Sequence, residues 1–409
     1  MNSQNSPPTG HLPTLIASFL HFDLSFMLWV LLGALGVYIG ESMGLNPAEK
    51  GLMVAVPALS GSLLRVPIGL LSDYAGGKLV GVALLAFLFV PLTLGWRAAE
   101  GLSDLLYIGL MLGAAGASFA VTLPLACSWY PLSRQGLVMG IVAAGNSGAV
   151  VANLLAPPLA ALVGWNNVLG LAMLPLSLVL VAFLLMAQDS PVRTRGEPLA
   201  RYLMALQHRD LWWLCIFYSV TFGGFAGLSS FLPTLLRDQY RVNPATAGYL
   251  TALAAFAGSA ARPLGGYLAD RLGGVRMLSW LLFGIGAVYT VGSRLPELGI
   301  MVVLLVSGMV CLGMGNGAVF QLVPQRFSNQ IGITTGVVGA VGGLGGFLLP
   351  VVLGLSKQVY DSFSPGFVLL ALLALGAFAL LRVLVATQET WRWSWRVPHT
   401  DGVREDIQI

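Results

Sequence analysis

The sequence predicts an all-α membrane protein with twelve transmembrane helices arranged as two six-helix halves. Of its 409 residues, 56% are hydrophobic and only 9% are charged, whereas soluble domains carry about 25% charged residues. Apolar runs of membrane-spanning length alternate with short polar breaks, and a motif in the first half recurs in the second. This composition excludes an ordinary cytosolic enzyme, a nucleic-acid-binding protein and a disordered scaffold, and it requires the lipid bilayer as a partner.

Each predicted span is an apolar run close to the roughly 20 residues that a bilayer core requires. The runs lie at about 24–44, 50–72, 79–96, 105–129, 136–160, 165–187, 211–236, 245–269, 277–294, 298–323, 332–356 and 364–386. One long polar connection follows the sixth run. The predicted parts are therefore an N-terminal tail (1–22), an N-terminal half (23–187), a linker (188–209), a C-terminal half (210–387) and a C-terminal tail (388–409).

The basic residues predict the orientation, because cytoplasmic loops carry an excess of Lys and Arg. If the N-terminus is inside, thirteen basic residues fall on the inner side and six on the outer side. Both termini are therefore expected in the cytoplasm. Two arginines, Arg65 and Arg262, belong to neither set because they lie within apolar runs.

The motif that recurs is the segment from Gly61 to Gly77, which matches the segment from Gly258 to Gly274 at a constant offset of 197 residues. The match aligns Gly, Ser, Arg, Gly, Asp and Gly-Gly, which indicates an internal duplication. Parallel halves of this kind are related by an axis along the membrane normal and bind substrate near the midplane between them. This arrangement describes the major facilitator fold.

The polar ends of the two copies resemble the major facilitator loop motif that follows spans 2 and 8. Its charged residues are Asp73 and Lys78 in the first copy and Asp270, Arg271 and Arg276 in the second. The resemblance implies that these residues control conformational gating. The first copy keeps only one of the two basic residues that the family has after the glycine, so weaker gating salt bridges are expected there.

Arg65 and Arg262 are the candidate substrate-binding residues, because a charge at the bilayer centre costs at least about 2.5–3.5 kcal/mol and marks function. Each lies eight residues before its loop Asp, or about 12 Å along a helix, so the two arginines are expected at equal depth. All 17 acidic residues fall in predicted loops or near span ends, Asp23 and Glu41 being the closest. Two guanidiniums without an acid favour a small planar anion as substrate.

Glycine-rich stretches in spans 5 and 11 predict a tight site. The first contains Gly145 and Asn146, and the second contains Gly342. Small residues allow close helix packing, and this density of glycine also brings backbone dipoles and Asn146 close to a small ligand.

These stretches resemble the paired signature motifs of the nitrate/nitrite porter family within the major facilitators. The resemblance covers essentially the whole chain and implies a bacterial inner-membrane carrier of nitrate or nitrite. It implies that Arg65 and Arg262 clamp the anion and that Asn146 donates a hydrogen bond to it. It also implies an aromatic wall of Phe119, Tyr218 and Phe222, for which plain core packing is an equal alternative.

The coupling mechanism stays open at this point. All four histidines, His11, His21, His208 and His399, lie outside the predicted spans, so no side chain in the predicted spans titrates near neutral pH and exchange of nitrate for nitrite is favoured. The resemblance, by contrast, is closest to the nitrate-uptake branch, which implies proton symport. A tyrosine, a water chain or Asp23 could then carry the proton.

Two alternatives to nitrate transport remain: a carrier of cyanate, formate or a small carboxylate, and a sensor that binds the anion without moving it. An enzyme is not expected, because the sequence contains no cofactor motif and no metal-ligand cluster. Each of its three cysteines lies alone in an apolar stretch. The chain is expected to act as a monomer without a cofactor.

Overall fold

The computed structural model describes residues 10–190, 204, 206–327 and 331–396, and within them every regular element is a helix. The N-terminal half contains α1 (Leu12–Trp29), α2 (Leu31–Ala34), α3 (Gly36–Met43), α4 (Pro47–Ala75), α5 (Gly77–Arg97), α6 (Leu102–Leu112), η1 (Gly113–Ala117), α7 (Phe119–Cys127), α8 (Leu132–Ala143), η2 (Ala144–Ser147), α9 (Gly148–Val163), α10 (Trp165–Leu171) and α11 (Met173–Met186). The C-terminal half contains α13 (Arg209–Tyr240), α14 (Pro244–Leu272), α15 (Gly274–Gly292), α16 (Leu298–Arg326), α17 (Ile331–Tyr360), α18 (Ser364–Thr387) and α19 (Glu389–Arg396).

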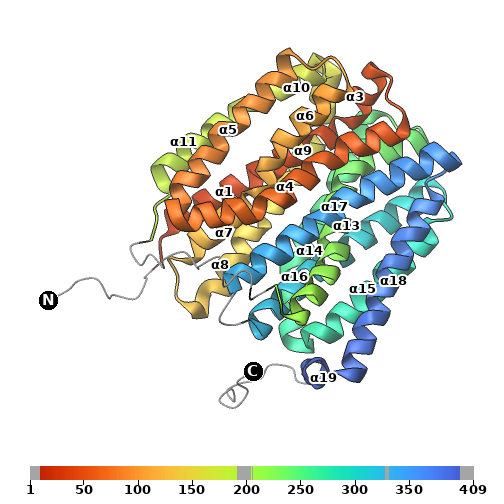
Figure 1. Cartoon of the computed structure of the whole chain (residues 1–409). Helices are drawn as coiled ribbons and strands as arrows, with labels where there is room; N and C mark the ends of the chain where they lie inside the picture. Colours follow the sequence, from red (N-terminus) through yellow and green to blue (C-terminus); the bar gives the residue numbers. More distant parts are fainter. Residues whose placement is uncertain (1–9, 191–203, 205, 328–330, 397–409) are drawn as a thin grey trace.

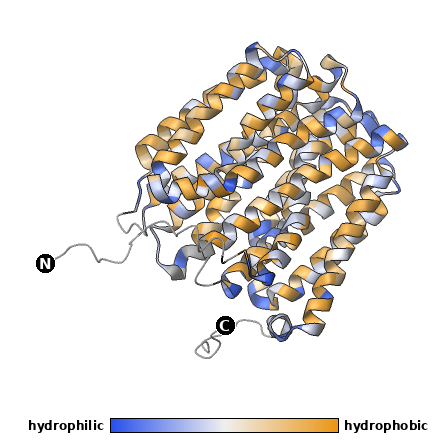
Figure 2. Cartoon of the chain, viewed as in Figure 1, coloured by the Kyte–Doolittle hydropathy of each residue, from blue (hydrophilic) through white to orange (hydrophobic). Residues whose placement is uncertain are grey.

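The predicted all-α membrane architecture is confirmed. In the described part of the chain, eleven helical segments are long and apolar enough to cross a membrane. Helix α14, at 29 residues, has a comparable length but is not among these eleven, because its alanines and the charged residues Arg262, Asp270 and Arg271 lower its hydropathy. Apolar residues cover the middle of the helices, and polar residues gather at their ends (Figure 2).

The helix bounds repeat with the offset of the sequence motif. Helix α4 begins at Pro47 and ends at Ala75, and α14 begins at Pro244 and ends at Leu272. Each follows an asparagine, Asn46 or Asn243, whose side chain accepts a hydrogen bond from a first-turn backbone amide. An Asn N-cap followed by Pro is a strong start signal for a helix. The duplicated sequence therefore specifies two equivalent starts.

The two halves meet along several helix pairs. Helix α4 packs along α17, α14 packs along α9, and α13 packs against α2, α3 and α4. Figure 1 shows α4 and α17 side by side at the centre of the bundle. Their closest approach uses glycine: a side chain on Gly51 would meet the backbone of Pro350 and Gly354. Any larger residue would force the halves apart.

The first span begins earlier than the sequence predicted. Helix α1 starts at Leu12, so residues 12–22 are helical and do not belong to a tail. His11 caps the helix, with its ring nitrogen accepting a hydrogen bond from the Thr14 amide. The polar residues His21 and Asp23 lower the hydropathy of this stretch, so the apolar run was predicted to begin only at residue 24. In the structure both side chains have hydrogen-bond partners inside the protein.

Two further elements were not foreseen. Helix α19 occupies residues that were predicted as C-terminal tail. Spans 4 and 5 are each interrupted by a short 3-10 turn, η1 and η2, both made of small residues. Most of the predicted linker, 188–209, lies outside the described residues.

Candidate anion-binding site

Arg65 lies in the interior of the protein, where the two halves meet. Its side chain is 3% exposed. Its Nε donates to the Gly116 carbonyl oxygen over 2.9 Å, and its Nη1 donates to the carbonyl oxygen of Gly339. Gly116 belongs to η1 in the N-terminal half and Gly339 to α17 in the C-terminal half. Arg65 therefore bridges the halves through backbone oxygens.

Aromatic rings surround the Arg65 guanidinium. Its central carbon lies 5.2 Å from the ring centre of Phe222, 5.5 Å from that of Trp29 and 5.9 Å from that of Phe119. The negative face of an aromatic ring attracts a cation. Three rings and two carbonyl dipoles thus offset part of the cost of burying this charge without an acid.

Arg262 is the second buried cation, with 7% of the residue exposed. Its central carbon lies 5.5 Å from the ring centre of Phe320. The Phe320 ring lies 6.0 Å from that of Phe119, which in turn lies 5.9 Å from the Arg65 guanidinium. The two arginines predicted to share a depth are therefore connected through packed aromatic rings.

The predicted aromatic residues gather between the two arginines. Tyr218 stacks on Phe222 with ring centres 5.0 Å apart and nearly parallel planes, and it meets Phe320 edge-on at 4.9 Å. Phe119 reaches Phe320 across the halves at 6.0 Å. A side chain on Gly342 would collide with the Tyr218 ring. The structure thus brings Arg65, Arg262, Phe119, Tyr218, Phe222 and Gly342 into one cluster, which we call the arginine–aromatic cage.

Asn146 lies next to this cage. It is 1% exposed, and its Oδ1 has no hydrogen-bond partner among the described residues. Its neighbour Gly145 packs against the ring of Phe22, which lies 5.2 Å from the ring of Phe119. Turn η2, which carries Asn146, also contacts α14, the helix of Arg262. An anion can use only the amide nitrogen of this side chain, because the Oδ1 accepts hydrogen bonds and cannot donate them.

No acid in the described part of the chain forms an ion pair with either arginine of the cage. Within the described residues, the ion pairs are Lys50–Asp238, Arg237–Glu41, Arg326–Asp210 and Lys357–Asp361, and none of them involves Arg65 or Arg262. The described residues also contain no group of three or more His, Cys, Asp or Glu that could hold a metal ion. The chemistry available in the cage is the binding of a small anion by guanidinium and amide groups.

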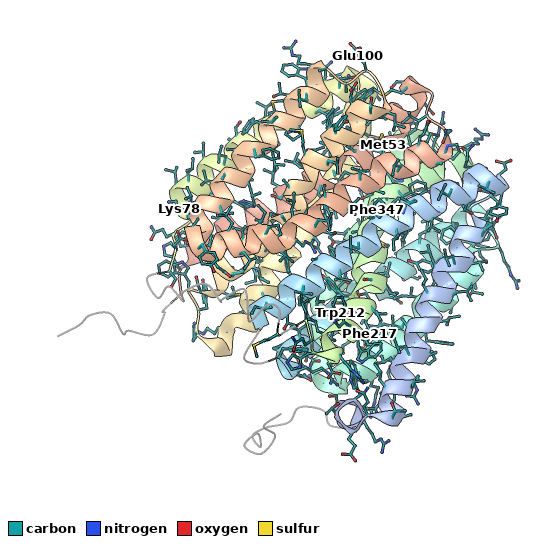
Figure 3. The ribbon with its side chains drawn as sticks, in the orientation of Figure 1. Met53, Lys78, Glu100, Trp212, Phe217 and Phe347 are labelled. Carbon is teal, nitrogen blue, oxygen red and sulfur yellow. The ribbon has the colours of Figure 1, made fainter. Side chains whose placement is uncertain are left out.

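The predicted gating residues lie away from the cage, at the ends of helices. Lys78 is the second residue of α5, and Figure 3 shows it at the opposite end of the N-terminal half from Glu100. Its backbone amide donates to Asp189. Arg271 packs over the Tyr267 ring, and Arg276 donates to the Trp395 carbonyl oxygen. Asp73 and Asp270 are within the last turn of α4 and α14.

Sequence reasoning missed several residues that contact the arginines of the cage. Trp29 and Phe320 each present a ring to an arginine, and Gly116 and Gly339 supply carbonyl oxygens. Phe320 could have been found from the duplication. It lies on α16, the helix of the second half that corresponds to span 4, and span 4 carries Phe119. Trp29 had none, since aromatic residues are frequent in every span.

The expectation that every histidine lies outside the spans was wrong. His21 is fully buried in α1, where its Nε2 bonds the Gly81 carbonyl oxygen at 3.1 Å and its Nδ1 meets Ser25. Asp23 is also in α1, and it accepts a hydrogen bond of 2.6 Å from Ser147. A titratable carboxyl therefore lies inside a spanning helix.

Comparisons with known proteins agree with this architecture. Residues 17–350 match the Major Facilitator Superfamily. A solved structure described as a bacterial homologue of the human lysosomal transporter Spinster, inward-facing and occupied, superposes with a TM-score of 0.69 at 17% identity. The superposition covers 93% of this chain and 97% of that one. At this identity the likeness supports the fold alone.

The sequence relatives are more specific. The nitrite extrusion protein of Bacillus subtilis is 34% identical over 87% of this chain and 90% of its own length. The probable nitrate/nitrite antiporter NarK1 of Thermus thermophilus is 32% identical over 90% of both chains. The probable nitrate/nitrite transporter NarK2 of Mycobacterium tuberculosis is 32% identical over 87% of this chain and 91% of its own. The chain therefore belongs to the Major Facilitator Superfamily and, within it, to the nitrate/nitrite porter family.

Proposed function

We propose that this protein is a secondary transporter that carries nitrate, nitrite or both across the bacterial inner membrane. The observation that carries the proposal is a pair of buried arginines with no acid partner among the described residues. Relatives that match most of the chain are named as nitrate or nitrite carriers. The excess of basic residues on one side supports a cytoplasmic position for both termini.

The anion binds within the arginine–aromatic cage. A guanidinium has five N–H donors, and two of those on Arg65 are used by Gly116 and Gly339. The remaining donors, together with those of Arg262, suit a flat ion with three oxygens, because the guanidinium fork pairs with planar oxyanions. Asn146 adds a neutral hydrogen-bond donor through its amide nitrogen.

Transport occurs by alternating access, in which one end of the helix bundle is closed while the other end is open to the site. Two ion pairs join the halves at the predicted outer end: Lys50 with Asp238 at 3.1 Å and Glu41 with Arg237 at 2.8 Å. We propose that Asp73, Lys78, Asp270, Arg271 and Arg276 hold the cytoplasmic end in the opposite state. The chain acts as a monomer, and as a carrier rather than an enzyme.

We propose that the protein moves nitrate into the cell. The relatives carry names for both extrusion and exchange, so exchange of nitrate for nitrite is the second candidate. The partly buried carboxyl of Asp23 in α1, which the sequence placed outside the spans, is the observation that favours uptake driven by protons.

Flux into proteoliposomes tests the proposal. Purified protein should take up labelled nitrate, and unlabelled nitrite should compete more strongly than chloride, formate or cyanate. Arg65→Lys and Arg262→Lys should each abolish this uptake, because an ammonium group cannot reproduce the planar fork. Arg97→Lys, at an exposed position over Trp96, is the matched control. Wild-type uptake by either cage variant, or stronger competition by formate, contradicts the proposal.

A further inference from the structure

Asp23 is the one acidic residue among the described spans that contacts the turn carrying Asn146. Its Oδ1 accepts a hydrogen bond of 2.6 Å from Ser147 Oγ. Its backbone packs against Gly145 and Gly148, where any side chain would collide with it. The backbone of Asp23 therefore packs against the chain on both sides of Asn146, and its carboxyl is bonded to Ser147, the last residue of η2.

No cation neutralises Asp23 within the described part of the chain. The ion pairs there involve other acids. Helix α1 packs against α2, α5, α7, α8, α9, α11, η1 and η2. Only three of these elements have titratable or charged side chains, which are Lys78 and Arg97 on α5, Cys127 on α7 and Arg134 on α8.

These four charged or titratable side chains lie near the ends of their helices, away from Ser147, which bonds Asp23. Arg134 precedes Gly145 by eleven residues, or about 16 Å of helix. Lys78 is near the residues that hold His21, because Gly81 lies beside the His21 ring. His21 points away from Asp23, since two residues along a helix turn a side chain by about 200°. Turn η2 also contacts α14, the helix that carries Arg262, and the Arg65 guanidinium lies over the ring of Trp29 at the other end of α1.

We infer that Asp23 is the proton carrier of this transporter and that Ser147 couples its protonation to the anion bound beside Asn146. The inference rests on the proposed nitrate transport. When Asp23 is ionised, the Ser147 hydroxyl donates to it; when Asp23 is protonated, its own O–H can donate to Ser147, and the hydrogen bond reverses. Asn146 and Ser147 are consecutive residues of one 3-10 turn, so the reversal acts directly on the position of Asn146.

Charge balance links the two ligands. Binding nitrate alone changes the net charge of Arg65, Arg262 and Asp23 together, which is costly in a low-dielectric interior. Binding nitrate together with a proton on Asp23 leaves their net charge unchanged. The empty carrier and the fully loaded carrier therefore carry the same charge when they reorient, whereas the carrier with only one ligand does not.

The test uses the full chain in proteoliposomes that contain a pH dye, with the membrane potential clamped at zero. In the wild type, external nitrate should acidify the lumen, and an imposed pH gradient should drive nitrate accumulation. Asp23→Asn should lose both effects by at least tenfold, yet keep exchange of labelled for unlabelled nitrate, because exchange needs no net proton movement. Asp104→Asn, a cap at a loop, is the matched control and should behave as the wild type.

Two further variants guard against a folding defect. Asp23→Glu keeps a carboxyl and should restore proton uptake. Ser147→Ala should shift the pH of half-maximal uptake upward, because the ionised carboxyl loses a hydrogen-bond donor. Nitrate-driven acidification by Asp23→Asn, or its absence in a wild type that exchanges nitrate, overturns the inference and leaves nitrate transport standing. Absence of all nitrate flux in the wild type instead overturns the proposed function.

Discussion

At the scale of residues, the arrangement of Arg65 explains how a cation stays buried without an acid. Carbonyl oxygens of Gly116 and Gly339 accept its protons, and three ring faces surround it. The family resemblance implied an aromatic wall around the anion, and in the structure three aromatic rings lie against the Arg65 guanidinium. The rings therefore stabilise the empty site, which keeps the guanidinium in place before an anion arrives.

Gly342→Ala should reduce nitrate uptake at least tenfold. An added Cβ would collide with the Tyr218 ring, and Tyr218 stacks on Phe222 beside Arg65, so the substitution must displace the cage. Gly336→Ala, on the same helix with open space around it, should transport as the wild type. Initial rates of labelled nitrate uptake decide this, with protein content of the vesicles measured for each variant; equal rates for the two variants would show that Gly342 serves only helix packing.

Asn146→Ala should weaken nitrate binding by about 10-fold, corresponding to about 1–1.5 kcal/mol for one hydrogen bond. The side chain is buried, and its amide nitrogen is the group that can donate to an anion, so its loss should change the ligand more than the fold. Competition of nitrate and nitrite for binding to purified protein measures the effect. An unchanged affinity for both ions would assign Asn146 to packing against α1 and α14.

The two arginines could be predicted from the sequence, and their aromatic partners only in part. A charge in a spanning run is rare, so Arg65 and Arg262 stand out, and their equal distance from a loop Asp places them at one depth. Trp29 and Phe320 could not be singled out, because only tertiary packing distinguishes them from the other aromatic residues. The roles of Phe119, Tyr218 and Phe222 as an anion wall stay predictions.

At the scale of elements, the helices whose predicted ends failed are those with mixed polarity. In helix α1, which begins at Leu12, the polar side chains of His21 and Asp23 bond partners on α5 and η2. These partners are distant in sequence, so the hydropathy of the segment alone could not predict them. Helix α19 is amphipathic and short, so hydropathy alone assigned it to a tail. Its Trp391 ring is fully buried, lies under Arg326 and donates to Asp210.

Trp391→Ala should lower the free energy of unfolding by about 3–5 kcal/mol, the usual cost of removing a buried tryptophan. The substitution also strips Arg326 and Asp210 of a neighbour at the end of the C-terminal half. Thermal unfolding in detergent measures this, with the exposed Trp280 replaced by Ala as the control. Equal unfolding temperatures for the two variants would mean that α19 does not stabilise the bundle.

At the scale of the whole molecule, the two halves are tied together at one end. The pairs Lys50–Asp238 and Glu41–Arg237 join α3 and α4 to α13. These contacts link residues nearly half a chain apart, for example 188 positions between Lys50 and Asp238. The duplication predicts that the halves face each other, but the sequence does not show at which end of the bundle ion pairs join them. The structure places these pairs at the end that carries Lys50 and Glu41.

Asp238→Asn should open the outer end more often. The half-buried pair with Lys50 contributes on the order of 1 kcal/mol to the closed arrangement, so reactivity of Ser230→Cys, which lines a small cavity beside Trp29, toward an impermeant thiol reagent should rise several-fold. Lys357→Met breaks a pair within the C-terminal half alone and should leave the rate unchanged. The parent without Ser230→Cys corrects for the native cysteines. A rate for Asp238→Asn that equals that of Lys357→Met would contradict the proposed outer gate.

The most direct measurement is an experimentally determined structure of the protein with bound nitrate, at a resolution that places a four-atom ion. The account predicts density between the guanidiniums of Arg65 and Arg262, within hydrogen-bond distance of both, with neither arginine paired to a carboxylate. Nitrate found elsewhere, or an aspartate or glutamate seated on either guanidinium, would contradict it.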